Sequence, residues 1–150
     1  MAGLCVSEPV LNPAAEGEPA FTRADLVFYG VDHSGPSFEA RIFLNSPEAG
    51  LSTPRDPEAG FAGSFTIFGH AGCAGDAGHC DVPTGPADPF DVRPPHALTR
   101  QTRTVIITEA LQRISAPELI ITIVPVRPGP LSAELAETLA FDEFRLLTYL

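Results

Sequence analysis

Two cysteines, two histidines and two aspartates fall within the glycine-rich segment from Gly69 to Asp81. Thiolates and imidazoles bind thiophilic metal ions, and a Cu(I) or Zn²⁺ site in this segment would use two of each: His70, Cys73, His79 and Cys80. Cys73 and Cys80 are alternatively able to form a disulfide, because their spacing permits closure and the glycines ease the geometry. A third interpretation leaves the cysteines unlinked, with the glycines serving only turns.

The spacing separates these possibilities only in part. The order His-x2-Cys-x5-His-Cys differs from zinc fingers and ribbons, whose ligands come in pairs about two to four residues apart. A blue-copper site needs two histidines and a cysteine, usually with an axial methionine, and the one methionine of the chain is Met1. The disulfide is the first expectation and the metal site the second, and all three interpretations stay open.

No other pattern predicts a catalytic residue. His33 lies in a turn-like segment and His96 follows two prolines, so both are expected to be ordinary turn or loop residues. The chain has no Gly-x-Ser-x-Gly elbow, no phosphate-binding loop of the Walker type and no glycine-rich dinucleotide fingerprint. Cys5 has no evident partner and is expected to be a free thiol. We therefore expect that the chain is not an enzyme and requires no cofactor, with copper or zinc as the alternative.

Composition narrows the range of partners. The 150 residues carry nine arginines, no lysine and 19 acidic side chains, for a net charge of −10 at pH 7. Nucleic acids and anionic membranes attract basic surfaces, so neither is expected as a partner. No apolar run approaches the roughly 20 residues that span a bilayer, and the N-terminus lacks a basic, then apolar leader. These features predict a cytoplasmic protein, unless the chain was cut from a longer one.

Glycine and proline are frequent in this sequence. The 16 prolines and 13 glycines fall mostly between apolar runs, which favours short strands joined by long loops over a helical bundle. We predict an irregular segment or linker over residues 1–22, in which Cys5 and Val6 form a short pairing, and a single domain over residues 23–150. A hairpin turn is expected at 32–36, a mobile loop at 46–60 and a long irregular loop at 69–101.

The apolar runs within this domain predict a mainly antiparallel β-sandwich of about seven strands with one or two short helices. In the strand at 37–44, Phe38, Ala40, Ile42 and Leu44 share one face. The most apolar strand, at 119–126, is expected to be central, with Pro125 near its exposed end. The other strands are expected at 26–31, 61–68, 103–108 and 144–150, and the helices at 109–114 and 132–139.

Three stretches resemble a known family: the run Phe28–Asn45, the strand Phe61–Phe65 and the loop Gly69–Asp81. They are similar to the region that follows the copper domain in bacterial tyrosinase-like proteins, relatives of polyphenol oxidases and molluscan haemocyanins. In that family a helical dicopper domain is joined to a C-terminal β-sandwich. The resemblance covers about residues 26–150 and consists of strand and turn patterns, not catalytic signatures.

The resemblance implies an accessory role. A type-3 dicopper centre takes six histidines, and this chain has four, none of them in a helical His-x3-His pair. No copper ligand of the family is therefore carried over to a position here. The implied function is a non-catalytic sandwich that shields or stabilises a copper oxidase domain, in the same chain or a separate one. The alternatives are a metal-handling module built on the 70–80 loop and, for an exposed face or edge strand, a homo-oligomer.

Overall fold

Nearly all the regular structure that the described residues form is β-strand. The structure is a computed structural model that describes residues 4–15, 21–71, 80, 89–90, 98–128, 133–135 and 139–150. The strands of these residues are β1 (Cys5–Val6), β2 (Val10–Leu11), β3 (Arg23–Val31), β4 (Phe38–Leu44), β5 (Phe61–Ile67), β6 (Gln101–Ile106), β7 (Glu118–Leu119), β8 (Ile121–Pro128), β9 (Ala133–Leu135) and β10 (Glu143–Tyr149). A 3-10 turn, η1 (Pro57–Ala59), and a helix, α1 (Thr108–Gln112), complete the list.

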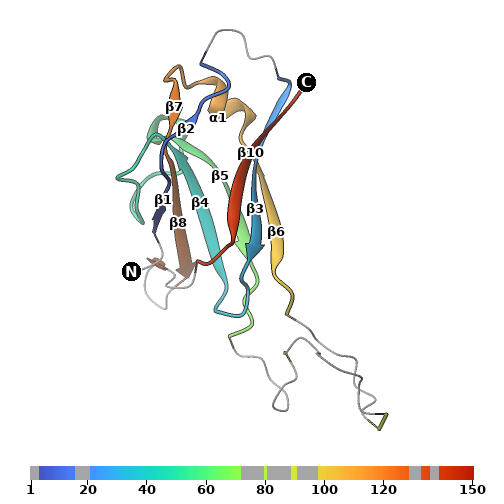
Figure 1. Cartoon of the computed structure of the whole chain (residues 1–150). Coiled ribbons are helices and arrows are strands. Elements are labelled where there is room, and N and C mark those ends of the chain that lie inside the picture. The colour runs from blue at the N-terminus through green and yellow to red at the C-terminus, as the bar shows by residue number, and fades with distance from the viewer. Residues whose placement is uncertain are drawn as a thin grey trace.

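Two antiparallel sheets form the sandwich (Figure 1). The larger sheet has the order β1-β8-β4-β5, with β9 also paired to β8, and the smaller sheet has the order β10-β3-β6. A third, two-stranded ladder joins β2 to β7. The predicted fold class, a mainly antiparallel β-sandwich with short helices, is therefore confirmed. No helix among the described residues is both long and apolar enough to cross a membrane.

Along β4 and the first part of β3, every second side chain is buried between the two sheets, and these side chains form part of the core. On β4 the predicted face of Phe38, Ala40, Ile42 and Leu44 is buried, and on β3 Ala24, Leu26 and Phe28 face it from the other sheet. The ring of Phe28 lies 5.0 Å from that of Phe65 on β5 and 5.4 Å from that of Phe141, measured between ring centroids. Phe28 therefore packs across the interface between the two sheets.

The strand that was expected to be central is interior in the larger sheet. β8 pairs with β4 on one side, and with β1 and then β9 on the other. The ladder with β1 reaches Ile123 and that with β9 resumes at Val126, so Pro125, which has no N–H to donate, lies at the interruption. Pro125 is nonetheless flanked by Ala40 of β4, inside the sheet and not at an exposed end.

Asn45 fixes the beginning of this central strand. Its backbone is in the left-handed region, with φ of 51°, which asparagine tolerates better than most residues. The Asn45 N–H donates to the Ile120 carbonyl at 2.8 Å, and the Asn45 Oδ1 accepts from the Ile120 N–H at 2.7 Å. The backbone and the side chain of one residue thus hold the end of β4 against the start of β8.

A second apolar cluster covers the outer face of the larger sheet. Phe43, Val124 and Val126 are buried there beneath Ala49, with Leu51 packed against them. Ala49 and Leu51 belong to the segment 46–60, which was predicted to be a mobile loop. That interpretation was incomplete, because the segment also contains η1, where the Asp56 side chain accepts from the Ala59 N–H at 2.8 Å. Apolar residues between the prolines let this segment cover the sheet.

Two short-range predictions were wrong. Residues 32–36 were expected to form a hairpin, but β3 pairs with β6 and β10 whereas β4 pairs with β5 and β8, so this connection crosses between sheets. The helix expected at 132–139 is replaced over Ala133–Leu135 by β9, because an isolated helix this short is marginal and pairing with β8 supplies hydrogen bonds. The helix expected at 109–114 is present as α1.

The N-terminal residues take part in the sheets. Cys5 and Val6 form the expected short pairing, and the structure shows β8 as their partner. The β2 ladder to β7 was not predicted. Asn12 is buried and donates from Nδ2 to the carbonyls of Ile114 and Ala116 at 2.9 and 2.8 Å. The division of the chain at residue 22 stays a prediction.

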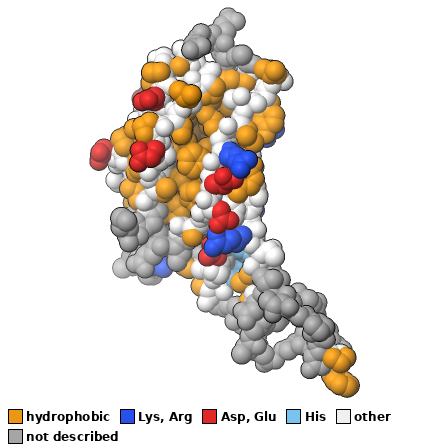
Figure 2. Space-filling model, in the orientation of Figure 1, with side chains coloured by type: hydrophobic (Ala, Val, Ile, Leu, Met, Phe, Trp, Pro, Cys, Tyr) orange, Lys and Arg blue, Asp and Glu red, His pale blue; other side chains and the backbone are white. Residues whose placement is uncertain are grey.

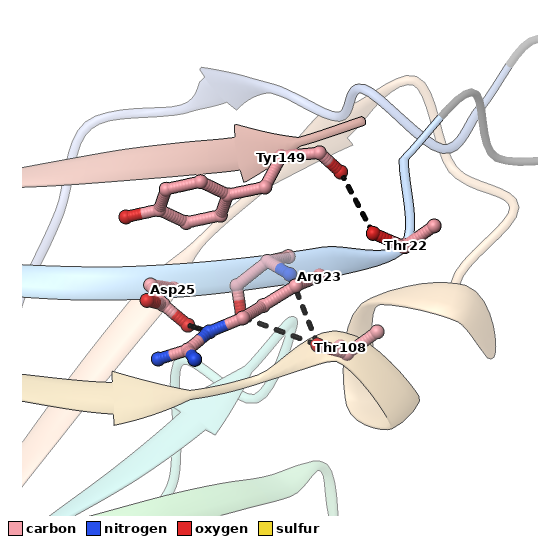
Figure 3. Close-up of polar contacts among 6 residues, drawn as sticks. Thr22, Arg23, Asp25, Thr108 and Tyr149 are labelled. Atoms are coloured by element: carbon pink, nitrogen blue, oxygen red, sulfur yellow. Dashed lines mark hydrogen bonds and ion pairs between the residues drawn. The ribbon is translucent and has the colours of Figure 1, made fainter.

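A corner of the smaller sheet is held by polar contacts among neighbouring elements (Figure 3). The Ala24 N–H donates to Thr108 Oγ1 at 2.9 Å, which attaches the start of α1 to β3. Arg23 Nε donates to Asp25 Oδ1 at 2.8 Å, and the guanidinium lies over the Tyr149 ring at 5.8 Å from its centroid. The Thr22 N–H donates to the Tyr149 carbonyl at 2.7 Å, closing the end of β10 against β3.

Acid should weaken the cover over the outer face through Glu39. Burial opposes ionisation of this carboxylate, but hydrogen bonds from Arg55, Ser64 and Arg41 hold its pKa below the usual value. A lowered folded-state pKa stabilises the protein at pH values above the unfolded-state pKa, and this stabilisation is lost as the pH falls through the lowered pKa. Glu39→Gln should therefore reduce the free energy of unfolding at neutral pH and flatten its decline in acid.

Urea unfolding at a series of pH values measures this effect. Glu8→Gln, which changes an exposed carboxylate, is the matched control and should follow the unsubstituted chain. Equal pH dependence in all three proteins would contradict the role given to Glu39.

Candidate functional site

His33 is the buried polar side chain around which the candidate site is built. It follows β3 and is 6% exposed. Its Nε2 lies 2.7 Å from the carbonyl oxygen of Thr99, and its Nδ1 lies 3.3 Å from Nε2 of Gln101. A carbonyl only accepts, so Nε2 carries the proton and donates, while Nδ1 accepts from the Gln101 amide. Both ring nitrogens are thus engaged within the protein.

His70 lies directly against His33. The His70 N–H donates to the His33 carbonyl at 2.9 Å, and the two rings meet edge to face with centroids 5.0 Å apart. Phe68 contacts the other side of the His70 ring, with centroids 5.6 Å apart, and is itself 76% exposed. Of the four residues predicted as metal ligands, His70 is therefore placed beside a histidine that the sequence did not associate with it.

Backbone contacts bring the two ends of the long irregular segment together at this point. The Ala71 N–H donates to the Gly35 carbonyl at 3.0 Å, and the Gly69 N–H donates to Ser37 Oγ at 2.9 Å. A Cβ at Gly69 would lie 2.1 Å from the Gly35 oxygen, so the approach requires glycine. With Thr99 bonded to His33 on the other side, residues 69–71 and 99–101 are anchored on the same turn.

The turn itself is stabilised by Asp32. Its Oδ1 accepts from the Ser34 N–H at 2.9 Å, and hydrogen bonds from the Ser34 backbone and hydroxyl hold the pKa of the Asp32 carboxyl below its usual range. An ionised aspartate that bonds the backbone two residues on is the turn chemistry expected from the sequence. The turn forms, but it joins the two sheets instead of closing a hairpin.

The predicted ligand set is described only in part. His70 and Cys80 belong to the described residues, whereas Cys73, His79 and His96 lie outside them. Cys80 is not a free cysteine, whereas Cys5 is the free cysteine of the described part. Within those residues no group of three or more His, Cys, Asp or Glu side chains is placed to hold a metal ion. The Cys73–Cys80 disulfide and the four-ligand metal site both remain predictions.

Cys5 behaves as a small core side chain. It packs against the apolar core from β1, and burial raises the pKa of its thiol. A thiol that is less ionised than usual is a weaker nucleophile and metal ligand.

The contact between His33 and Thr99 was not predicted. The turn residues around His33 were recognisable, but a contact across 66 positions of sequence leaves no local pattern. The strand expected at 103–108 was recognised, but its pairing with the strand that precedes His33 was not.

His33 should control the local stability of this anchor. His33→Leu keeps the size of the side chain but leaves the Thr99 carbonyl and the Gln101 amide without their partner, at a cost of about 1–3 kcal/mol. Amide hydrogen exchange at His70 and Ala71 should accelerate, while exchange at Ile123 in the centre of the larger sheet should change far less. Unchanged exchange at His70 and Ala71 would contradict the anchor.

Counting thiols tests the first expectation for the loop. If Cys73 and Cys80 are joined, the unfolded chain should show one reactive thiol before reduction and three after it, the single thiol being Cys5. A thiol reagent under denaturing, metal-free conditions makes the measurement. Three thiols before reduction would exclude the disulfide and leave both cysteines available to Cu(I) or Zn²⁺.

Of three comparisons with known proteins, the one with solved structures finds matches to the fold. A comparison with protein-family models finds no match, and neither does one with curated proteins. Solved structures do match, among them latent aurone synthase, a polyphenol oxidase. The recombinant form has a TM-score of 0.50 and 16% identity over 97% of this chain and 24% of its own. The form from the natural source has the same TM-score and identity over 97% and 25%.

A third structure, latent aurone synthase co-crystallised with hexatungstotellurate(VI), gives a TM-score of 0.51 and 17% identity over 97% of this chain and 24% of its own. At such low identity the likeness concerns the fold alone. This chain spans about a quarter of the length of those proteins. It is thus a β-sandwich similar in fold to one part of a polyphenol oxidase.

Proposed function

We propose that this chain is a non-catalytic β-sandwich domain that associates with a tyrosinase-like copper oxidase and stabilises or shields it. The observation that carries the proposal is the asymmetric coverage of the comparison. Nearly the whole chain corresponds to only a quarter of a latent polyphenol oxidase. The sequence resemblance to the sandwich of tyrosinase-like proteins supports the same assignment.

The histidine content supports a role without chemistry of its own. The chain has four histidines against the six of a dicopper centre, and His33 has both ring nitrogens engaged within the protein. These residues do not fit a type-3 copper pair. The oxidase that it accompanies would lie in the same chain or in a separate one.

Catechol oxidation and copper retention test the proposal directly. With added copper, the isolated chain should oxidise catechol no faster than free copper does. A bacterial tyrosinase-like copper domain lacking its own sandwich should, when joined to this chain, lose copper more slowly on dialysis or turn over catechol more slowly. An unrelated sandwich of similar size serves as the matched fusion.

Two results would overturn the proposal. Turnover by the isolated chain above the copper blank would remove the non-catalytic part. Copper retention and turnover equal to those of the control fusion would remove the association.

The metal-handling module, with Cu(I) or Zn²⁺ held by His70, Cys73, His79 and Cys80, is retained as a second proposal. The placement of His70 at the anchored base of the loop favours it. The thiol count above decides whether both cysteines are available for it.

A further inference from the structure

β10 forms one regular edge of the smaller sheet. All seven of its residues are in register with β3, from Glu143 opposite Tyr29 to Tyr149 opposite Arg23, without a bulge. On its other side β10 pairs with no strand of the described residues, because it is the end of the smaller sheet. The strand contains no proline, and Figure 1 shows it along the front of the molecule. Such an edge offers free N–H and C=O groups to another strand.

An apolar groove runs beside this edge. Phe144 and Leu146 of β10 line it on one side, and Val10, Leu11 and Pro13 line it on the other. Leu11 is 83% exposed. Figure 2 shows hydrophobic side chains gathered in a band beside β10. Exposed apolar surface next to an open edge is typical of association sites.

The charges on the outer face of β10 are already balanced within the chain. Arg145 Nη2 donates to Glu143 Oε1 at 2.6 Å, and the Arg145 guanidinium lies 5.4 Å from the centroid of the Tyr29 ring. The strand therefore carries one acidic and one basic side chain, although the chain as a whole is at −10. A second copy is able to approach this strand without facing an excess of like charge.

We propose that β10 pairs antiparallel with β10 of a second copy, across a two-fold axis, to form a homodimer with a continuous six-stranded sheet. The sequence of the strand is self-complementary when Leu147 lies on the axis. With Leu147 on the axis, Arg145 lies opposite Tyr149 of the second copy, and Leu147 lies opposite Leu147 of the second copy. No charged side chain then faces its own kind.

The two registers centred closer to Glu143 are less favourable. An axis through Arg145 would oppose two arginines, and an axis through Leu146 would place them on the diagonal. A continuous sheet keeps the inner faces of both copies on one side, so the two apolar grooves become adjacent and Leu146 lies opposite Thr148 of the second copy. This complementarity to itself selects a second copy over an unrelated strand.

Cross-linking at the axis tests the arrangement on the full chain. Leu147→Cys should give a disulfide-linked dimer under mild oxidation, because opposed residues of an antiparallel pair are close enough for the bond. Thr104→Cys, on the exposed face of β6 at the opposite edge of the same sheet, is the matched control and should stay monomeric on denaturing gels, as should the unsubstituted chain.

Light scattering over a concentration series gives the second measurement. The unsubstituted chain and Thr104→Lys should reach twice the monomer mass, while Leu147→Lys, which opposes two ammonium groups, should weaken the dimer about ten-fold or more. A chain that stays monomeric at every concentration would overturn the proposal. Cross-linking through Thr104→Cys instead of Leu147→Cys would do the same. Neither result bears on the association with an oxidase.

Discussion

The packing of the two inner sheet faces against each other is the constraint on which the other features depend. Fully burying a side chain such as Phe28 or Ile42 contributes about 1.5–3 kcal/mol, and the core contains many such residues from both sheets. The pairing of Val31 with Gln101 in the smaller sheet places the connection at 32–36 beside Thr99. The anchor at His33 thus continues the ladder between β3 and β6, two strands whose inner faces form part of the core.

The alternation of apolar and polar residues along the strands made it possible to predict core residues from the sequence. Residues 38–44 alternate except at Phe43, and the apolar run around Ile123 is long enough to indicate a strand buried on both faces. Two-residue strands such as β2 and the three-residue β9 carry no comparable periodicity, since their pairing depends on neighbours distant in sequence. The crossing between sheets was missed for a related reason: turn chemistry is local, whereas the choice of partner strand is made by the whole fold.

The candidate site, too, was predictable only in part. Its turn was predictable, because aspartate, serine and glycine have characteristic local bonds. The partners of His33 were not, because they come from the far side of the long segment. Chemistry-bearing residues are concentrated in connections, and the strands supply the rigid frame on which these connections are held. This arrangement accords with a sandwich whose fold is similar to that of one part of a much larger polyphenol oxidase.

The conformation and hydrogen bonds of Asn45 restrict which residues are able to replace it. A replacement must accept a left-handed backbone, which favours glycine, aspartate or asparagine. Glycine would lose the acceptor for the Ile120 N–H, and aspartate would lose the amide that donates to the Glu118 carbonyl. The backbone conformation and the side-chain hydrogen bonds thus both restrict this one position. We expect related sequences to vary less here than at the exposed residues around it.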